Sequence, residues 1–134
     1  MIRSSLTLLA LLCSVATPAF AETWRLAAGS ESAREYVDVD SIVRDGDTVR
    51  FSRETRFPSL QSLESIPRFD RLLVHYSSHC GDRTLSRLHI IVKRGDEVVG
   101  TYQGDRQAEH AEPGSVAAGV LMAVCDDRWP DPNQ

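Results

Sequence analysis

The segment Phe69–Cys80 places a cysteine at the end of an apolar, alternating strand, and this cysteine restricts the fold more than any other residue. Alternate residues of a strand point to opposite faces, so Val74, Tyr76 and Cys80 share one face. A second cysteine, Cys125, lies at the end of the last apolar segment. A bond between the two would tie a buried strand to the C-terminal part of the chain.

The first 21 residues have the three parts of a secretory signal peptide. Arg3 supplies the positive charge, residues 6–15 form the apolar core, and Ala19 and Ala21 place small residues at the cleavage positions. The apolar run is shorter than the roughly 20 residues that a spanning helix needs. We expect cleavage between Ala21 and Glu22, a mature chain without an integral membrane segment, and a location in the periplasm or, as a secreted protein, at the cell surface.

The count of cysteines then favours a single disulfide. Cys13 lies within the expected signal peptide and follows Leu12, whereas lipid attachment usually requires a small residue at that position. Cys80 and Cys125 remain in an oxidising compartment, where disulfides persist. A metal or redox pair is the alternative, but the two cysteines lack the CxxC spacing of such sites.

Glycine-containing turns divide the mature chain into strands. Asp45–Asp47 separates two alternating segments, which is typical of a β-hairpin. Cys80–Arg83 and Arg94–Asp96 predict two further turns, whereas residues 57–68 are bounded by prolines and predict a surface loop. The pattern indicates an antiparallel β-sheet meander of about five or six strands.

The last apolar segment predicts a helix that packs on this sheet. Ser115 is an expected N-cap, and Val120, Leu121 and Val124 recur at helical spacing. Gly119 suits a close approach to the sheet. The predicted fold is therefore α+β, with one C-terminal α-helix and one disulfide, in a single domain over residues 22–126 that a flexible tail follows at 127–134.

The histidines raise the question of a metal site. His75 and His79 would share an ion on a helix, but on a strand this spacing separates them by about 13 Å. A hairpin centred on Asp82 would instead bring His75 opposite His89. Two ligands without a nearby carboxylate make a weak site, so we expect neither a metal nor a cofactor, and we treat this pair as a candidate binding site.

Motifs of catalysis and of nucleic-acid binding are missing from the sequence. It has no GxSxG turn for a nucleophilic serine and no glycine-rich phosphate loop. Acidic residues outnumber basic ones, 19 to 15, and no block of like charge stands out. We therefore predict a protein that is not an enzyme and does not bind nucleic acid.

Arg94–Gly95–Asp96 spells RGD, a tripeptide that many integrins recognise on exposed loops. Its expected position at a hairpin tip would display both charges. Gly-Asp is also ordinary turn chemistry, so the same residues have a purely structural interpretation.

The order of several short motifs resembles the surface-adhesin protein E family of small bacterial envelope proteins. These motifs follow the signal peptide and are Trp24, Tyr36–Ile42, Asp45–Gly46, Cys80, Pro113–Ser115 and Cys125.

The resemblance implies an antiparallel sheet covered by a C-terminal helix, with the two cysteines joined. The founding member is similar to an outer-membrane adhesin that binds host matrix and serum proteins. The resemblance thus implies an exported binding or adhesion module, with host extracellular or envelope proteins as partners. The alternative is a periplasmic ligand-binding or stress-related domain, in which the face of His75 and His89 would line a pocket.

Overall fold

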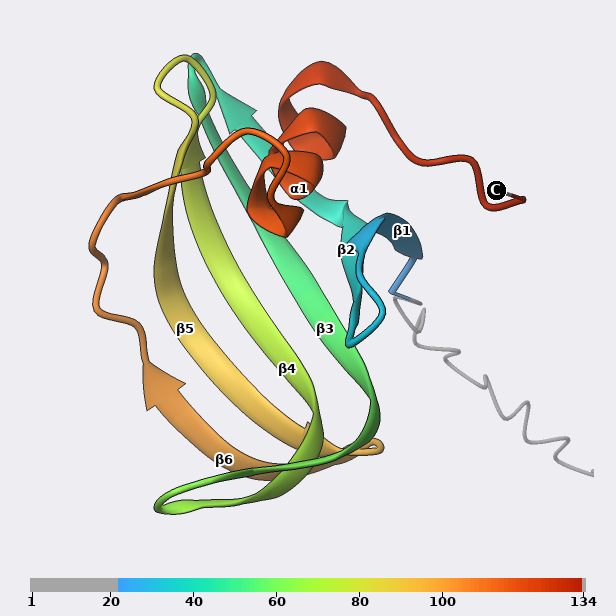
Figure 1. Cartoon of the computed structure of the whole chain (residues 1–134). Helices are drawn as coiled ribbons and strands as arrows, with labels where there is room; N and C mark the ends of the chain where they lie inside the picture. Colours follow the sequence, from blue (N-terminus) through green and yellow to red (C-terminus); the bar gives the residue numbers. More distant parts are fainter. Residues whose placement is uncertain (1–21, 134) are drawn as a thin grey trace, which may run out of the picture.

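The computed structural model describes residues 22–133, so the predicted signal peptide and its cleavage position at Ala21 lie outside the described residues. The described chain forms one antiparallel sheet and one helix (Figure 1). Their bounds are Trp24–Gly29 (β1), Arg34–Asp45 (β2), Thr48–Leu63 (β3), Ile66–His79 (β4), Thr84–Arg94 (β5), Glu97–Gln103 (β6), Glu109–His110 (β7) and Val116–Asp126 (α1).

The strands follow one another across the sheet in chain order, from β1 to β6, and the short β7 pairs with β5. This order confirms the predicted meander and its single helix. The sheet is strongly curved, and α1 packs against its inner face near one end (Figure 1). We call the opposite side of the sheet the outer face.

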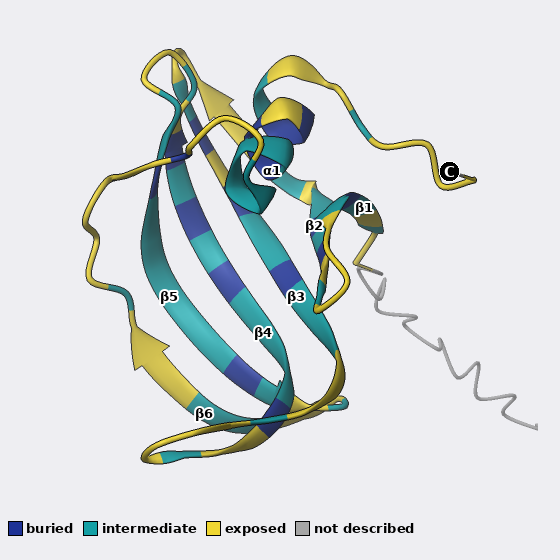
Figure 2. Cartoon of the chain, viewed as in Figure 1, coloured by how far each residue is buried: buried dark blue, intermediate teal, exposed yellow. Residues whose placement is uncertain are grey.

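The core lies between the inner face and α1. Buried bands alternate with less buried residues along β3, β4 and β5, as a strand covered on one side requires (Figure 2). Phe51 on β3 pairs with Tyr76 on β4, and their rings stack with centroids 5.5 Å apart. The core residues are Ala27, Val37, Val49, Phe51, Val74, Tyr76, Leu85, Ala111, Val120, Leu121, Ala123 and Val124.

The helix begins and is joined to the sheet as the sequence predicts. The backbone N–H of Ala118 donates to the side-chain oxygen of Ser115 at 3.1 Å, which confirms the N-cap. A Cβ at Gly119 would lie 3.1 Å from the Cβ of Ala28, so the glycine allows α1 to approach β1 closely. Cys80 and Cys125 form the predicted disulfide across 45 positions of sequence.

The prediction of a surface loop over residues 57–68 is wrong. These residues extend β3 and β4 into a long hairpin, with a turn at Glu64 and Ser65. Ser65 takes the left-handed φ of 65° that a tight hairpin turn needs. The pairing of β3 with β4 is irregular between Arg56 and Gln61, and at such a break Pro58 removes no required ladder hydrogen bond.

Residues 127–133 form no helix or strand, but the start of this segment contacts the domain. The Trp129 ring packs against the core, and the Arg25 guanidinium lies 4.6 Å from its centroid. This contact joins the start of the tail to β1.

Candidate binding surfaces

The Arg94–Gly95–Asp96 turn joins β5 to β6, as predicted, and Gly95 has a φ of 57°. Arg94 is exposed, but its guanidinium is tied to β4, because its Nε and Nη2 donate to the backbone oxygen of Arg68 at 3.1 and 2.9 Å. Asp96 is fully exposed and lies 3.5 Å from Arg71. Arg94 thus has a structural role in the turn, and a recognition role for the tripeptide stays a prediction.

The two predicted histidines lie opposite each other on the outer face. His75 on β4 pairs with His89 on β5, and their rings stack with centroids 6.1 Å apart. His75 Nδ1 is 2.7 Å from the hydroxyl oxygen of Ser52 on the neighbouring β3. Burial and the adjacent His89 lower the pKa of His75, against a smaller opposite effect of Glu22. The lowered pKa favours the neutral form of the His75 ring.

This pair has few of the neighbours that a metal site requires. Among residues 22–133, no group of three or more histidine, cysteine or acidic side chains is arranged to hold an ion. A pocket beside the β1–β2 loop and two cavities beside α1 are lined by other residues. A ligand at His75 and His89 would therefore rest on the open outer face.

A buried ion pair lies on the inner face, and the sequence analysis did not predict it. Arg53 Nε donates to Glu35 Oε2 at 2.8 Å, and the Thr55 hydroxyl donates to the same oxygen at 2.6 Å. Burial by itself would lower the pKa of Arg53, but Tyr76 and Glu35 together raise it above its ordinary value. The sequence holds one signal for this pair. Glu35 is two positions from the buried Val37 on the same strand, so both side chains point to the inner face.

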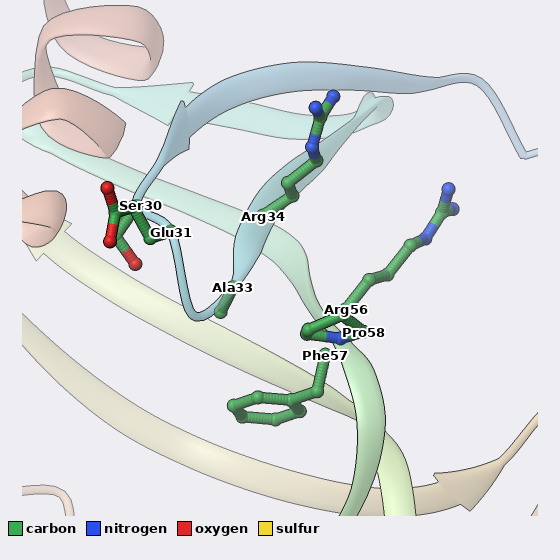
Figure 3. Close-up of a pocket in the computed structure, with 7 residues that line it drawn as sticks. All are labelled: Ser30, Glu31, Ala33, Arg34, Arg56, Phe57 and Pro58. Carbon is green, nitrogen blue, oxygen red and sulfur yellow. The ribbon is translucent and has the colours of Figure 1, made fainter.

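A pocket of about 360 Å³ lies between the β1–β2 loop and the bend of β3 (Figure 3). Its lining residues are Ser30, Glu31, Ala33, Arg34, Arg56, Phe57 and Pro58. The guanidinium groups of Arg34 and Arg56 extend to the same side, away from the Phe57 ring (Figure 3). The pocket therefore has an aromatic wall, and its two arginines direct their charged ends away from that wall.

The last strand of the meander leaves one edge of the sheet open. Over the described residues, β6 pairs only with β5. The Gly104 N–H donates to the Leu88 oxygen, so Gly104 and Leu88 are a hydrogen-bonded pair. Hydrogen-bonded and non-hydrogen-bonded pairs alternate along an antiparallel ladder, which makes Gln103 and Thr101 members of non-hydrogen-bonded pairs. Their backbone N–H and C=O groups therefore point away from β5. These groups are available to another strand.

These features define a class of protein: a small curved sheet with its inner face closed by a helix and a disulfide, and with its outer face and the β6 edge open. Two crystal structures of protein E from Haemophilus influenzae have this fold. One matches with a TM-score of 0.56 and 12% identity, covering 80% of this chain and 97% of the other. The second, from a non-typeable strain, has a TM-score of 0.54 and 14% identity and covers 84% and 82%.

The sequence itself identifies the family. The sequence model of surface-adhesin protein E matches residues 24–126, which is nearly the whole described chain. The protein therefore belongs to the surface-adhesin protein E family, which confirms the resemblance. A comparison with curated proteins gave no match. Over the described residues, no helix has the length and apolar composition that a membrane crossing demands.

Proposed function

We propose that the protein is a non-enzymatic adhesin-type module of the cell envelope, which binds extended segments of host extracellular or envelope proteins at the open edge of β6. Family membership supports the adhesin class. The observation that carries the binding mode is the unpaired backbone of Thr101 and Gln103 on a strand that is paired on one side only. A partner strand gains main-chain hydrogen bonds there without any change in the fold.

The geometry of β6 keeps this edge ready for a partner. Tyr102 covers Gly100, because a Cβ at Gly100 would lie 2.9 Å from the Tyr102 ring. An aromatic side chain over a glycine holds an otherwise weak strand in its extended form. The edge is therefore held in the conformation that a partner strand requires.

The test measures binding of the mature protein to immobilised extracellular-matrix proteins, with serum albumin as the control surface. Thr101→Pro removes one outward N–H and no ladder hydrogen bond, and we expect at least a tenfold loss of affinity. Thr101→Val retains the N–H and should bind like the wild type. Equal binding by both variants would contradict the edge mechanism, and no binding to any matrix protein would contradict the adhesin proposal.

The second candidate function is a periplasmic domain that binds a small ligand at His75 and His89. The stacked ring pair and its bond to Ser52 favour it. The variant pair His75→Ala and His89→Ala tests it, because unchanged stability and an unchanged response in ligand screens would count against the site.

A further inference from the structure

A row of four cations crosses the outer face, one from each of four neighbouring strands. Arg34 on β2 pairs with Arg56 on β3. Arg56 pairs in turn with Arg71 on β4, and Arg71 with Lys93 on β5. Directly paired residues project from the same face of a sheet, and the spacing of strands makes this row about 14 Å long. We call these four residues the basic row.

One buried carboxylate lies beneath the row. Glu54 is 1% exposed, and its oxygens are 2.7 Å from Arg56 Nε, 3.3 Å from Lys93 Nζ and 3.7 Å from Arg71 Nη1. Arg56 also stacks over the Tyr36 ring at 4.1 Å. These contacts fix the cations in place, but one carboxylate does not neutralise three of them.

The remaining charge is only partly compensated. Asp96 contributes one more carboxylate, 3.5 Å from Arg71. Arg34 is exposed and forms no ion pair within residues 22–133. Like charges directly opposite each other destabilise a sheet, so four cations facing two carboxylates indicate an anionic partner.

Exposed aliphatic side chains lie at the same end of the sheet. Val98 pairs directly with Lys93 and extends the row onto β6. Leu60 and Leu63 belong to the β3–β4 hairpin, which lies with the β5–β6 turn at the end opposite α1 (Figure 1). The exposed fractions of Leu60, Leu63 and Val98 are 41%, 58% and 56%.

The other exposed charged residues of this end are two arginines and two glutamates. Arg68 and Arg94 are exposed there, and so are Glu64 and Glu97. Asp70 accepts from the Gly95 N–H at this end and adds one more carboxylate, so the four cations of the basic row stand against Glu54, Asp96 and Asp70. The positive charge that remains at this end belongs to the basic row, although the whole chain has a net charge of −4.

We propose that this end of the sheet docks on an anionic lipid surface, with the basic row against phosphate headgroups and Leu60, Leu63 and Val98 entering the interface. The arginine fork binds phosphate oxygens in pairs, and apolar side chains beside cations add the interfacial contribution. A soluble polyanion would use the cations but would leave the aliphatic side chains in water. The inference goes beyond the proposed function, because it concerns lipid at the basic row and not a protein strand at the β6 edge.

The test is co-sedimentation of the mature protein with vesicles of phosphatidylcholine alone or of phosphatidylcholine and phosphatidylglycerol in equal parts. We expect binding to the mixed vesicles only, weakening as salt is added. Heparin in solution provides the polyanion arm of the experiment.

The variant Arg34→Gln with Arg71→Gln leaves Arg56 and Lys93 on Glu54, so the fold should be retained. Removal of two charges should weaken vesicle binding on the order of tenfold. Arg50→Gln with Arg128→Gln is the matched control, since both arginines are exposed and lie away from the row. Leu63→Ser with Val98→Ser should reduce the part of the binding that persists in high salt.

Three results would overturn the proposal. These are equal binding to both kinds of vesicle, an equal loss in the control variant, and binding to heparin without binding to vesicles. The last result would assign the basic row to a soluble polyanion. The vesicle test uses no matrix protein. Its failure would therefore not affect the β6 edge mechanism, which the Thr101 variants test separately.

Discussion

The two faces of the same strands have opposite characters. On β3, Val49 and Phe51 are buried against the core, whereas Ser52, Glu54 and Arg56 project from the outer face with hydroxyl or charged groups. Neighbouring residues of one strand therefore serve different purposes. The inner face stabilises the fold with α1 and the disulfide, and the outer face is left to present charge. Variants on each face test this division.

Removal of the disulfide should have the largest effect, because it joins the inner side of the sheet to α1. The double variant Cys80→Ser with Cys125→Ser opens a loop of 45 positions and should lower the free energy of unfolding by about 4 kcal/mol. Urea denaturation measures this difference. A loss below about 1 kcal/mol would mean that the helix is held by packing alone.

The packing of α1 is tested by two neighbouring residues of the helix. Leu121 is fully buried against the sheet, and Met122 is 42% exposed. Leu121→Ala should lower the free energy of unfolding by about 3 kcal/mol because it leaves a cavity in the core. Met122→Ala is the matched control and should change it by less than about 0.5 kcal/mol. Similar losses in thermal or urea unfolding would contradict the packing of α1 on the inner face.

Glu54→Gln separates stability from binding on the outer face. The variant leaves three cations without their buried counter-charge, and because these cations are partly exposed we expect a loss of about 1–2 kcal/mol. The same change makes this face more positive, so binding to anionic vesicles should become stronger. Glu64→Gln, on the exposed hairpin turn, is the control for stability. A gain of stability in Glu54→Gln would mean that the cations do not depend on the carboxylate.

The histidine pair should give the smallest effect. The pKa of His75 is lowered by burial and by His89, so below about pH 6.5 the unfolded chain binds more protons than the folded one. Stability should therefore be complete above this pH and should decrease as the pH falls toward the lowered pKa.

His75→Gln should remove this part of the pH dependence, whereas His79→Gln should retain it because His79 is exposed. Urea denaturation at pH 7.5 and pH 5.5 provides the measurement. An unchanged pH profile in His75→Gln would show that the dependence arises elsewhere.

The sequence predicts the features whose signals are local. The Asp45–Asp47 hairpin, the cap at Ser115 and the helical face of Leu121 each depend on residues within a few positions of one another. The prediction of the disulfide required only the count of cysteines. The prediction that His89 lies opposite His75 required only the position of the turn at Asp82.

The long β3–β4 hairpin was missed because Leu60, Leu63 and Ile66 repeat every three residues and because Pro58 and Pro67 resemble strand boundaries. An irregular pairing, which places Pro58 where no ladder hydrogen bond is needed, cannot be recognised from composition. The strand conformation of this segment depends on the pairing of β3 with β4, which lies outside the local sequence pattern.

The basic row could not be predicted because it depends on three pairings at once. Arg34, Arg56, Arg71 and Lys93 come from four strands, and the pairings around them contain bulges at Asp38/Val43, His75/Tyr76 and Val92/Lys93. Each bulge shifts the register by an amount that residue spacing does not encode. In the linear sequence the same cations are scattered and form no block of charge.

We propose that this protein is an exported module whose outer face and β6 edge meet partners outside the cell. Antibody labelling of cells that express the full chain, before and after permeabilisation of the outer membrane, tests this most directly. We predict labelling of intact cells at nearly the level of permeabilised ones. Labelling that occurs only after permeabilisation would contradict a location at the cell surface and would place the partner of the β6 edge inside the periplasm.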